Sequence, residues 1–244
     1  MKTKLKRIGS VFLSFAVSLQ IFMGTTGGLS LTAFADSGTV IGPYTITGGM
    51  RNIDYKLEND VLHILSDIPL TIANTDIDTA SAVPIVVNTN VNGNITLAGV
   101  NIAPTSAAAI DVSPATQSKA NVTITIADDS INILKGGASS PEYYAGLQKD
   151  GEYISENEGK LIIQGETNGT GKLIAKGSSY AAGIGSMGCA ESGITSWYTS
   201  NIHIINCIID ATGGDGQRTA AIGTGYRPAG SGMATYTTTS YIYK

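Results

Sequence analysis

The stretch that decides the fold is residues 121–148, NVTITIADDSINILKGGASSPEYYAGLQ. Its first run alternates apolar and polar side chains, with Val122, Ile124 and Ile126 on one face, which is the pattern of a strand with one buried face. A second strand-like run, SINILKGG, begins at Ser130, and a third ends with Leu147. One unit of this sequence therefore offers three short strands separated by turns.

The same pattern returns along the chain. A small residue followed by an apolar residue recurs at intervals of 37, 37 and 38 positions, at Ala109-Ile110, Gly146-Leu147, Gly183-Ile184 and Ala221-Ile222. The intervals contain matching strand-like runs, such as GKLIIQG from Gly159 and NIHIINCIID from Asn201. Spacing this regular is typical of a repeat architecture. We expect the four apolar members to lie in single file on successive turns.

Helices are not available to cover a conventional parallel sheet, because no useful stretch after residue 35 has the period of an amphipathic helix. A chain that winds through three strands per turn solves this, since each turn pairs with the next and encloses its own apolar interior. The sequence therefore predicts an all-β, right-handed parallel β-helix of about five three-strand turns. An antiparallel sandwich, which also has many short strands, is the alternative.

Turn residues and the order of the runs divide the chain into parts. Asn94, Asn121 and Asn201 open corresponding strands, where asparagine tolerates the left-handed backbone of a sharp corner. Aligning Asn201 with Asn94 places Ile204 on Leu97 and marks Cys207 as a core residue. The predicted parts are a signal peptide over 1–35, an N-terminal β cap with the first strands over 36–66, the β-helix over 67–225, and a C-terminal tail or truncated repeat over 226–244.

The first 35 residues have the layout of a secretory signal peptide. Four basic residues, at positions 2, 4, 6 and 7, precede an apolar run over 8–23, and Ala33-Phe34-Ala35 forms the cleavage site. An uncleaved membrane anchor is the alternative, although the run is short for a membrane span. We expect a secreted, extracellular protein with no membrane span in the mature chain.

Charge and cysteine content restrict the partners and the means of stabilisation. Cleavage removes four basic and no acidic residues, which moves the net charge from −4 to −8. This balance speaks against a nucleic-acid or anionic-lipid partner. Cys189 and Cys207 are the two cysteines, so no disulfide framework holds the fold, and a bridge between them stays open.

Several segments together carry a family resemblance: VLHILSDIPLTIANT, NITLAGVNI, the 121–148 stretch and GSSYAAGIGS. The sequence resembles repeat-bearing surface proteins of clostridia and related Gram-positive bacteria. It is similar in particular to their β-helical carbohydrate-binding domains, whose fold is like that of the pectate lyases. The resemblance implies a β-helix that binds glycans. It covers most of residues 44–225, and the chain has no LPxTG-type sorting sequence, which leaves attachment to the cell surface open.

Aromatic residues supply the candidate binding site. The positions four residues before Leu147, Ile184 and Ile222 should stack on successive turns, and further aromatic residues follow in a loop and after the last repeat signal. Aromatic faces with polar rims suit sugar rings, although such residues can also simply cover loops. The candidate carbohydrate-binding residues are Tyr143, Tyr180, Trp197, Tyr198, Arg218 and Tyr226.

Acidic residues give weaker signals. Hydrolysis of a glycosidic bond needs two facing carboxyl groups, and lyases of this fold need acidic calcium ligands near a basic residue. Asp210 and Asp215, near Arg218, are the candidate calcium ligands. Asp128, Asp129 and Asp215 also occupy positions where turns favour aspartate. We therefore expect no enzymatic activity and no cofactor other than calcium.

The sequence thus favours a secreted, non-catalytic carbohydrate-binding β-helix that acts at the bacterial surface or on extracellular polysaccharide, with a polysaccharide or host glycan as its partner. A structural stalk or adhesin fragment of a larger surface protein is the first alternative. A polysaccharide lyase or hydrolase is the second.

Overall fold

The computed structural model describes residues 17–18, 34–35, 38–151, 158–190, 198–216, 219–226 and 240–243. The chain divides into two compact units, Met1–Gly38 and Thr39–Lys244. In the first unit, β1 (Val17–Ser18) and β2 (Phe34–Ala35) pair antiparallel. The rest of the predicted signal peptide lies outside the described residues. The site and the repeats belong to the second unit.

The described part of the second unit consists of strands and one five-residue helix, α1 (Ser113–Gln117). The prediction of an all-β chain is therefore confirmed. Among the described residues, no helix has the length and apolar character needed to cross a bilayer.

Three sheets hold most of the strands. The eight-stranded sheet has the order β24 (Ser240–Tyr243), β21 (Ile202–Ile205), β17 (Leu161–Gly165), β12 (Val122–Ile126), β9 (Asn94–Leu97), β7 (Leu70–Asn74), β4 (Tyr44–Thr47) and β3 (Thr39–Ile41). The seven-stranded sheet has the order β23 (Ile222–Gly223), β19 (Ile184–Gly185), β16 (Leu147–Gln148), β11 (Ile110–Asp111), β8 (Ile85–Val87), β6 (Val61–Ile64) and β5 (Tyr55–Glu58). The four-stranded sheet has the order β10 (Asn101–Ile102), β13 (Ile131–Lys135), β18 (Lys172–Lys176) and β22 (Ile208–Thr212).

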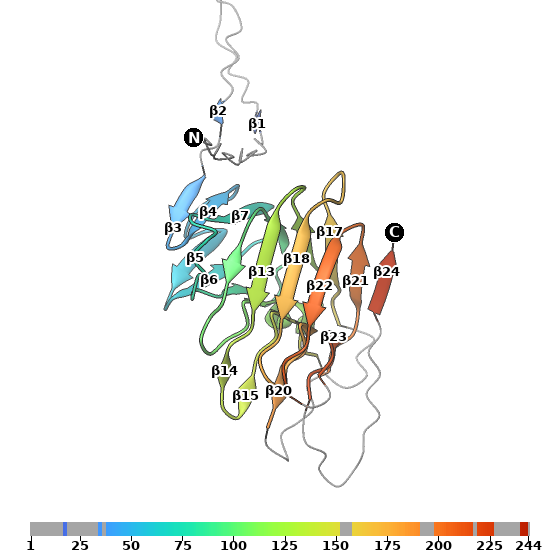
Figure 1. Cartoon of the computed structure of the whole chain (residues 1–244). Coiled ribbons are helices and arrows are strands. Elements are labelled where there is room, and N and C mark those ends of the chain that lie inside the picture. Colours follow the sequence, from blue (N-terminus) through green and yellow to red (C-terminus); the bar gives the residue numbers. More distant parts are fainter. Residues whose placement is uncertain are drawn as a thin grey trace, which may run out of the picture. The chain divides into compact units, whose positions relative to one another are not determined.

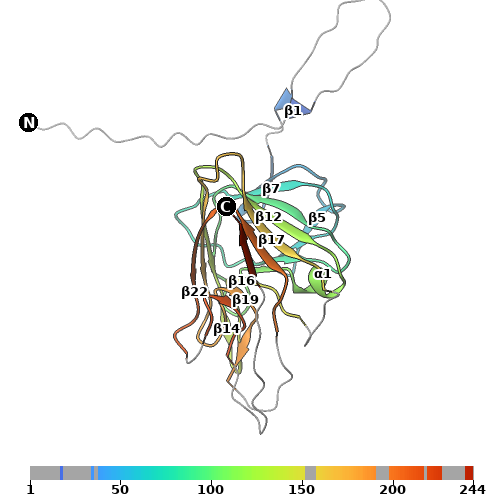
Figure 2. The same cartoon turned by 90° about the vertical axis from the view of Figure 1, so that its right-hand side faces the viewer.

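From β9 onward the chain visits the eight-stranded, four-stranded and seven-stranded sheets in a fixed order, and we call each such set of three strands a winding. Strands of neighbouring windings pair parallel in all three sheets. Figure 1 shows β13, β18 and β22 side by side, and Figure 2 shows β12 and β17 side by side in another layer. Ile110, Leu147, Ile184 and Ile222 are register partners, which confirms that they lie in single file.

The core follows from the alternation of the strands. In β12 the residues at 122, 124 and 126 are buried while the intervening threonines are half-buried, because successive side chains point to opposite faces. In the last windings Cys207, Ile209 and Ile222 pack against the core but remain partly exposed. Cys207 therefore faces the core as predicted, and no disulfide bond joins it to Cys189.

Two antiparallel hairpins precede the regular windings, within the predicted cap region 36–66. β3 pairs with β4, and β5 pairs with β6, so that β3 and β5 form the edges of two sheets. The β5–β6 turn has Asn59 and Asp60 at φ of 50° and 57°. Two successive left-handed residues are what a tight hairpin turn with the natural strand twist requires, and Asn and Asp tolerate them.

Candidate functional site

Tyrosine rings from three windings form a row, which we call the tyrosine row (Tyr143, Tyr180 and Tyr226). The ring centroids of Tyr143 and Tyr180 lie 4.9 Å apart, with the planes at 76°. Those of Tyr180 and Tyr226 lie 5.4 Å apart, with the planes at 35°. All three residues are half-buried. The row is therefore held by the protein yet keeps part of its surface in contact with solvent.

The row sits on a small antiparallel sheet of β14 (Ala138–Ser139), β15 (Glu142–Tyr143) and β20 (Gly188–Cys189). In Figure 1 these strands lie below β13, β18 and β22, on the side toward which those three strands point. Tyr143 and Tyr180 therefore lie in segments between the four-stranded and the seven-stranded sheet of their windings. Tyr226 lies after the seven-stranded sheet of its winding.

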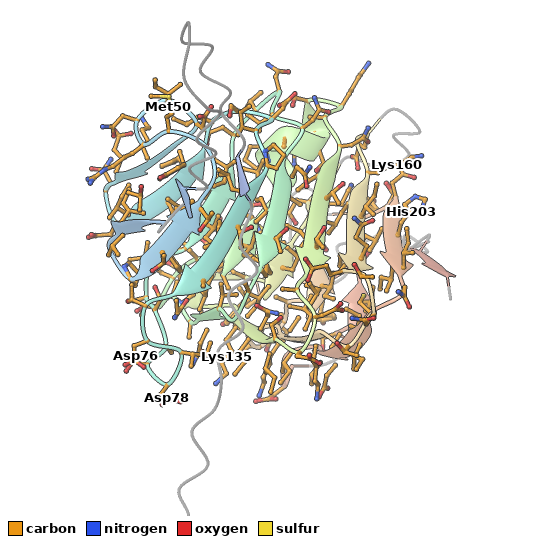
Figure 3. The ribbon with its side chains drawn as sticks, turned by 90° about the horizontal axis from the view of Figure 1, so that it is seen from above. Met50, Asp76, Asp78, Lys135, Lys160 and His203 are labelled. Atoms are coloured by element: carbon orange, nitrogen blue, oxygen red, sulfur yellow. The ribbon has the colours of Figure 1, made fainter. Side chains whose placement is uncertain are left out.

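Two lysines end neighbouring strands of the four-stranded sheet, just before these segments begin. Lys135 and Lys176 are register partners, and both are exposed. Like charges on directly opposite residues of neighbouring strands are destabilising. Asp215 lies 3.7 Å from the Lys176 Nζ atom, but its side chain is 90% exposed, so this ion pair contributes little. Figure 3 shows Lys135 on a different side of the fold from Lys160 and His203.

A buried carboxyl group, Asp150, follows β16 and is 3% exposed. Its Oδ1 atom accepts the backbone N–H of Met187 at 2.9 Å, and its Oδ2 atom accepts the Gln148 Nε2 group at 2.8 Å. Burial raises the pKa of Asp150 well above its ordinary value, and the neighbouring carboxyl group of Asp111 raises it further. Burial also raises the pKa of Asp111. The neutral form of Asp150 is therefore favoured.

Tyr144 belongs to the same polar group. Its hydroxyl donates to the Glu142 Oε2 atom at 2.7 Å. Burial and this bond to Glu142 raise the pKa of Tyr144 to about 12, and the nearby carboxyl groups of Asp111 and Asp150 contribute to the rise. These side chains thus share one acidic environment beside the tyrosine row.

Lys149 and Glu158 form a buried ion pair. The Lys149 Nζ atom lies 3.1 Å from the Glu158 Oε2 atom, and the side chains are 0% and 4% exposed. Burial lowers the pKa of Lys149, whereas the carboxylate of Glu158 raises it. The carboxylate lies against Gly151, where a Cβ atom would come within 2.2 Å of its oxygens. This pair is enclosed by protein and serves the fold rather than a ligand.

Tyr198, another predicted binding residue, is not part of the row. Tyr198 forms an isolated antiparallel bridge with Gly151, with N···O distances of 2.8 and 3.3 Å. Gly151 follows β16 whereas Tyr143 precedes it, so Tyr198 lies beyond the opposite end of that short strand. Trp197 and Arg218 lie outside the described residues, and their assignment stays a prediction.

The predicted calcium ligands each pair with a lysine. Asp210 lies 3.0 Å from the Lys172 Nζ atom, and Asp215 pairs with Lys176. Within the described ranges, no group of three or more Asp, Glu, His or Cys side chains is placed to share a metal ion. Calcium binding at Asp210 and Asp215 stays a prediction.

A separate cleft of about 330 Å³ lies at the connection between β7 and β8 and is lined by Pro43, residues 74–76 and residues 79–83. Its one carboxylate, Asp76, accepts the Thr79 hydroxyl at 2.7 Å, and this bond is the main cause that lowers the pKa of Asp76. The cleft contains none of the predicted site residues. Its size is at the lower end for small-ligand pockets, and its polar groups are mainly bonded to one another.

Sequence reasoning missed two residues that the site depends on, Asp150 and Gly188. Asp150 follows a strand without any spacing that marks it, and Gly188 is one of 30 glycines. The role of Gly188 appears only in the structure, where a Cβ atom added to this residue would meet the Tyr180 carbonyl oxygen at 2.0 Å. Comparison with protein-family models, with curated proteins and with solved structures found no match to this chain.

Proposed function

We propose that the protein is a secreted, non-catalytic carbohydrate-binding module whose tyrosine row contacts a polysaccharide or host glycan. The observation that carries this proposal is the row itself, three half-buried rings with centroid distances of 4.9 and 5.4 Å. Sugar rings offer apolar C–H faces that pack on aromatic side chains, while the phenol hydroxyls can bond the sugar hydroxyls. A row of this kind suits an extended chain better than a single sugar.

We further propose that the three sheets close around one core as a right-handed parallel β-helix. The fixed order in which the chain visits the sheets supports this, as does the parallel pairing of every regular winding with the next. In such a coil, neighbouring strands are about 4.8 Å apart. The ring separations in the row are close to this spacing, so the row follows the axis of the coil.

Secretion rests on the signal peptide predicted over residues 1–35, and action at the bacterial surface rests on the family resemblance. The absence of catalysis is proposed from where the carboxyl groups lie. Asp150, whose pKa is strongly raised, is 3% exposed and out of reach of a polymer. The Asp128 carboxylate accepts the backbone N–H of Asn168, on the neighbouring winding, at 2.8 Å, so it is engaged in holding two windings together.

The test is retention of the mature protein on an array of plant, bacterial and host glycans. We expect Tyr180→Ala to reduce retention most, because Tyr180 contacts both other rings of the row. Ile131→Ala is the matched control, since this side chain is 55% exposed on the outer face of the four-stranded sheet. Trp197→Ala and Arg218→Ala test the two predicted residues outside the described ranges. Unchanged retention of Tyr180→Ala, or equal loss in the control, refutes the proposed site.

The constant register of the windings also favours a second function, that of a stalk in a larger surface protein. A stack of identical windings makes a stiff spacer, because each winding pairs with the next along its strands. This alternative predicts no retention on any glycan. Release of new reducing ends or unsaturated products from pectin-like polymers would instead identify a hydrolase or a lyase.

A further inference from the structure

We propose that β20 is a strut that assembles the tyrosine row, and that Asp150 is the positioning residue that holds this strut and makes the assembly sensitive to pH. This inference rests on the proposed function for its biological meaning. The three tyrosines lie in three different windings, and no single strand of the regular windings connects all three.

β20 touches each tyrosine of the row in a different way. Gly188 is the register partner of Tyr143 in the antiparallel sheet. Gly188 also packs so closely on Tyr180 that a Cβ atom would lie 2.8 Å from the Tyr180 Cβ atom. The Cys189 N–H donates to the Tyr226 carbonyl oxygen at 2.9 Å. The three tyrosines come from three windings, and β20 contacts all of them; the Tyr226 N–H also donates directly to the Tyr180 carbonyl oxygen at 2.7 Å.

The segment that leads into β20 is held by bonds from two other windings. The Met187 N–H donates to the Asp150 Oδ1 atom at 2.9 Å, and the Asp150 N–H donates to the Ser113 Oγ atom at 2.8 Å. On the other side, the Gly225 N–H donates to the Ser186 Oγ atom at 2.9 Å. The Asp150 carboxyl group is the side chain that carries the link from β16 to this segment, so its loss frees one end of the strut.

The charges that face Asp150 oppose its ionisation. Asp111 on β11 raises its pKa. Lys149, its neighbour on the chain, lowers the pKa but is the least of the named causes and is itself paired elsewhere. Because the folded-state pKa is raised, the stabilisation is greatest when Asp150 is neutral and is lost as the pH rises through that pKa. The Met187 N–H bond favours the ionised form, but burial and the Asp111 carboxyl group outweigh it, so ionisation favours lifting β20 until water reaches the carboxylate.

Cys189 reports on this movement without any glycan, because it lies in β20 and is 1% exposed. We would measure the rate at which a thiol reagent labels Cys189 against pH in the Cys207→Ser background of the whole mature chain. In the wild type, the rate should rise with pH more steeply than the thiolate fraction, by up to about tenfold per pH unit. Asp150→Asn, which stays neutral, should remove this excess. Asp150→Ala should label rapidly at all pH values.

The control is labelling of Cys207 in a Cys189→Ser background, which should not respond to Asp150→Asn. Identical pH profiles for Cys189 in the wild type and Asp150→Asn would overturn the proposal, and so would an equal change at Cys207, which would indicate general loosening. Retention on a pectin column should follow Cys189 protection. If the protein binds no glycan on the array, the proposed function fails while the thiol measurement still decides the role of Asp150.

Discussion

The buried ion pair between Lys149 and Glu158 allows a quantitative test of how the interior is stabilised. Lys149→Met removes one charge and leaves the Glu158 carboxylate buried, at 4% exposure, with the Ser200 hydroxyl still 3.3 Å away. Breaking one side of a buried pair costs about 3–5 kcal/mol, because the other charge stays desolvated without compensation. For a denaturant slope of about 2–3 kcal/mol/M, the urea midpoint should fall by roughly 1–2.5 M.

The matched control is the ion pair of Lys172 and Asp210. Its N···O distance of 3.0 Å is almost the same as in the buried pair, but its side chains are 36% and 54% exposed. Lys172→Met should therefore cost at most about 1 kcal/mol. Both variants are compared with the wild type by urea unfolding followed by circular dichroism.

The double variant Lys149→Met/Glu158→Gln separates burial of charge from packing. It removes both charges, so it should be more stable than Lys149→Met alone, because no unpaired carboxylate remains. The reasoning is refuted if Lys149→Met is no more destabilising than Lys172→Met. It is equally refuted if neutralising Glu158 in the double variant recovers no free energy of unfolding.

Three further changes test the core, the strut and the lysine pair. Leu147 is 0% exposed, so Leu147→Ala should lower the free energy of unfolding by about 2–5 kcal/mol. Ile222 lies in the same file but is half-buried, so Ile222→Ala should lower it by less. Both changes are measured by urea unfolding. Gly188→Ala should reduce glycan retention and alter the near-ultraviolet circular dichroism of the tyrosines, because the Tyr180 carbonyl oxygen lies 2.0 Å from the new Cβ atom; an unchanged spectrum would contradict the strut. Lys135→Gln with Lys176→Gln should raise the free energy of unfolding by about 0.2–1 kcal/mol and weaken the salt dependence of binding to acidic polysaccharides, and a drop in stability would contradict the like-charge argument.

The repeat along the chain could be predicted because strand pairing acts on every winding in the same way. The four apolar residues at intervals of 37 or 38 positions are register partners throughout. The finer alignment was wrong by two residues. Aligning Asn201 with Asn94 put Ile204 on Leu97, whereas the register leads from Ile204 through Ile163 and Ile124 to Ile95.

That error still left every side chain on the correct face, because strand side chains alternate with a period of two. Its cause lies at Asn94. Val122, Leu161 and Ile202 are register partners, so Asn121 and Asn201 both come directly before the same position of the sheet. Asn94 is instead the register partner of Thr123, two residues further along. The same residue type at the start of a strand therefore does not always mark the same register position.

The positions of the tyrosine row could not all be predicted from the repeat spacing in the sequence. Lys135, Lys176 and Thr212 are register partners that end their strands. From these positions the chain takes 8, 4 and 14 residues to reach Tyr143, Tyr180 and Tyr226.

Counting four residues before each core position found Tyr143 and Tyr180, but for Ile222 it gave Arg218. The third ring of the row is Tyr226, which lies four residues after Ile222. In the regular windings, backbone hydrogen bonds fix where each residue lies, so residues separated by one repeat length occupy equivalent positions on neighbouring windings. Beyond the corner, position is set by contacts with β20, which the repeat does not encode. A row built this way can gain or lose residues between core and ring without disturbing the core, provided the strut still reaches all three rings.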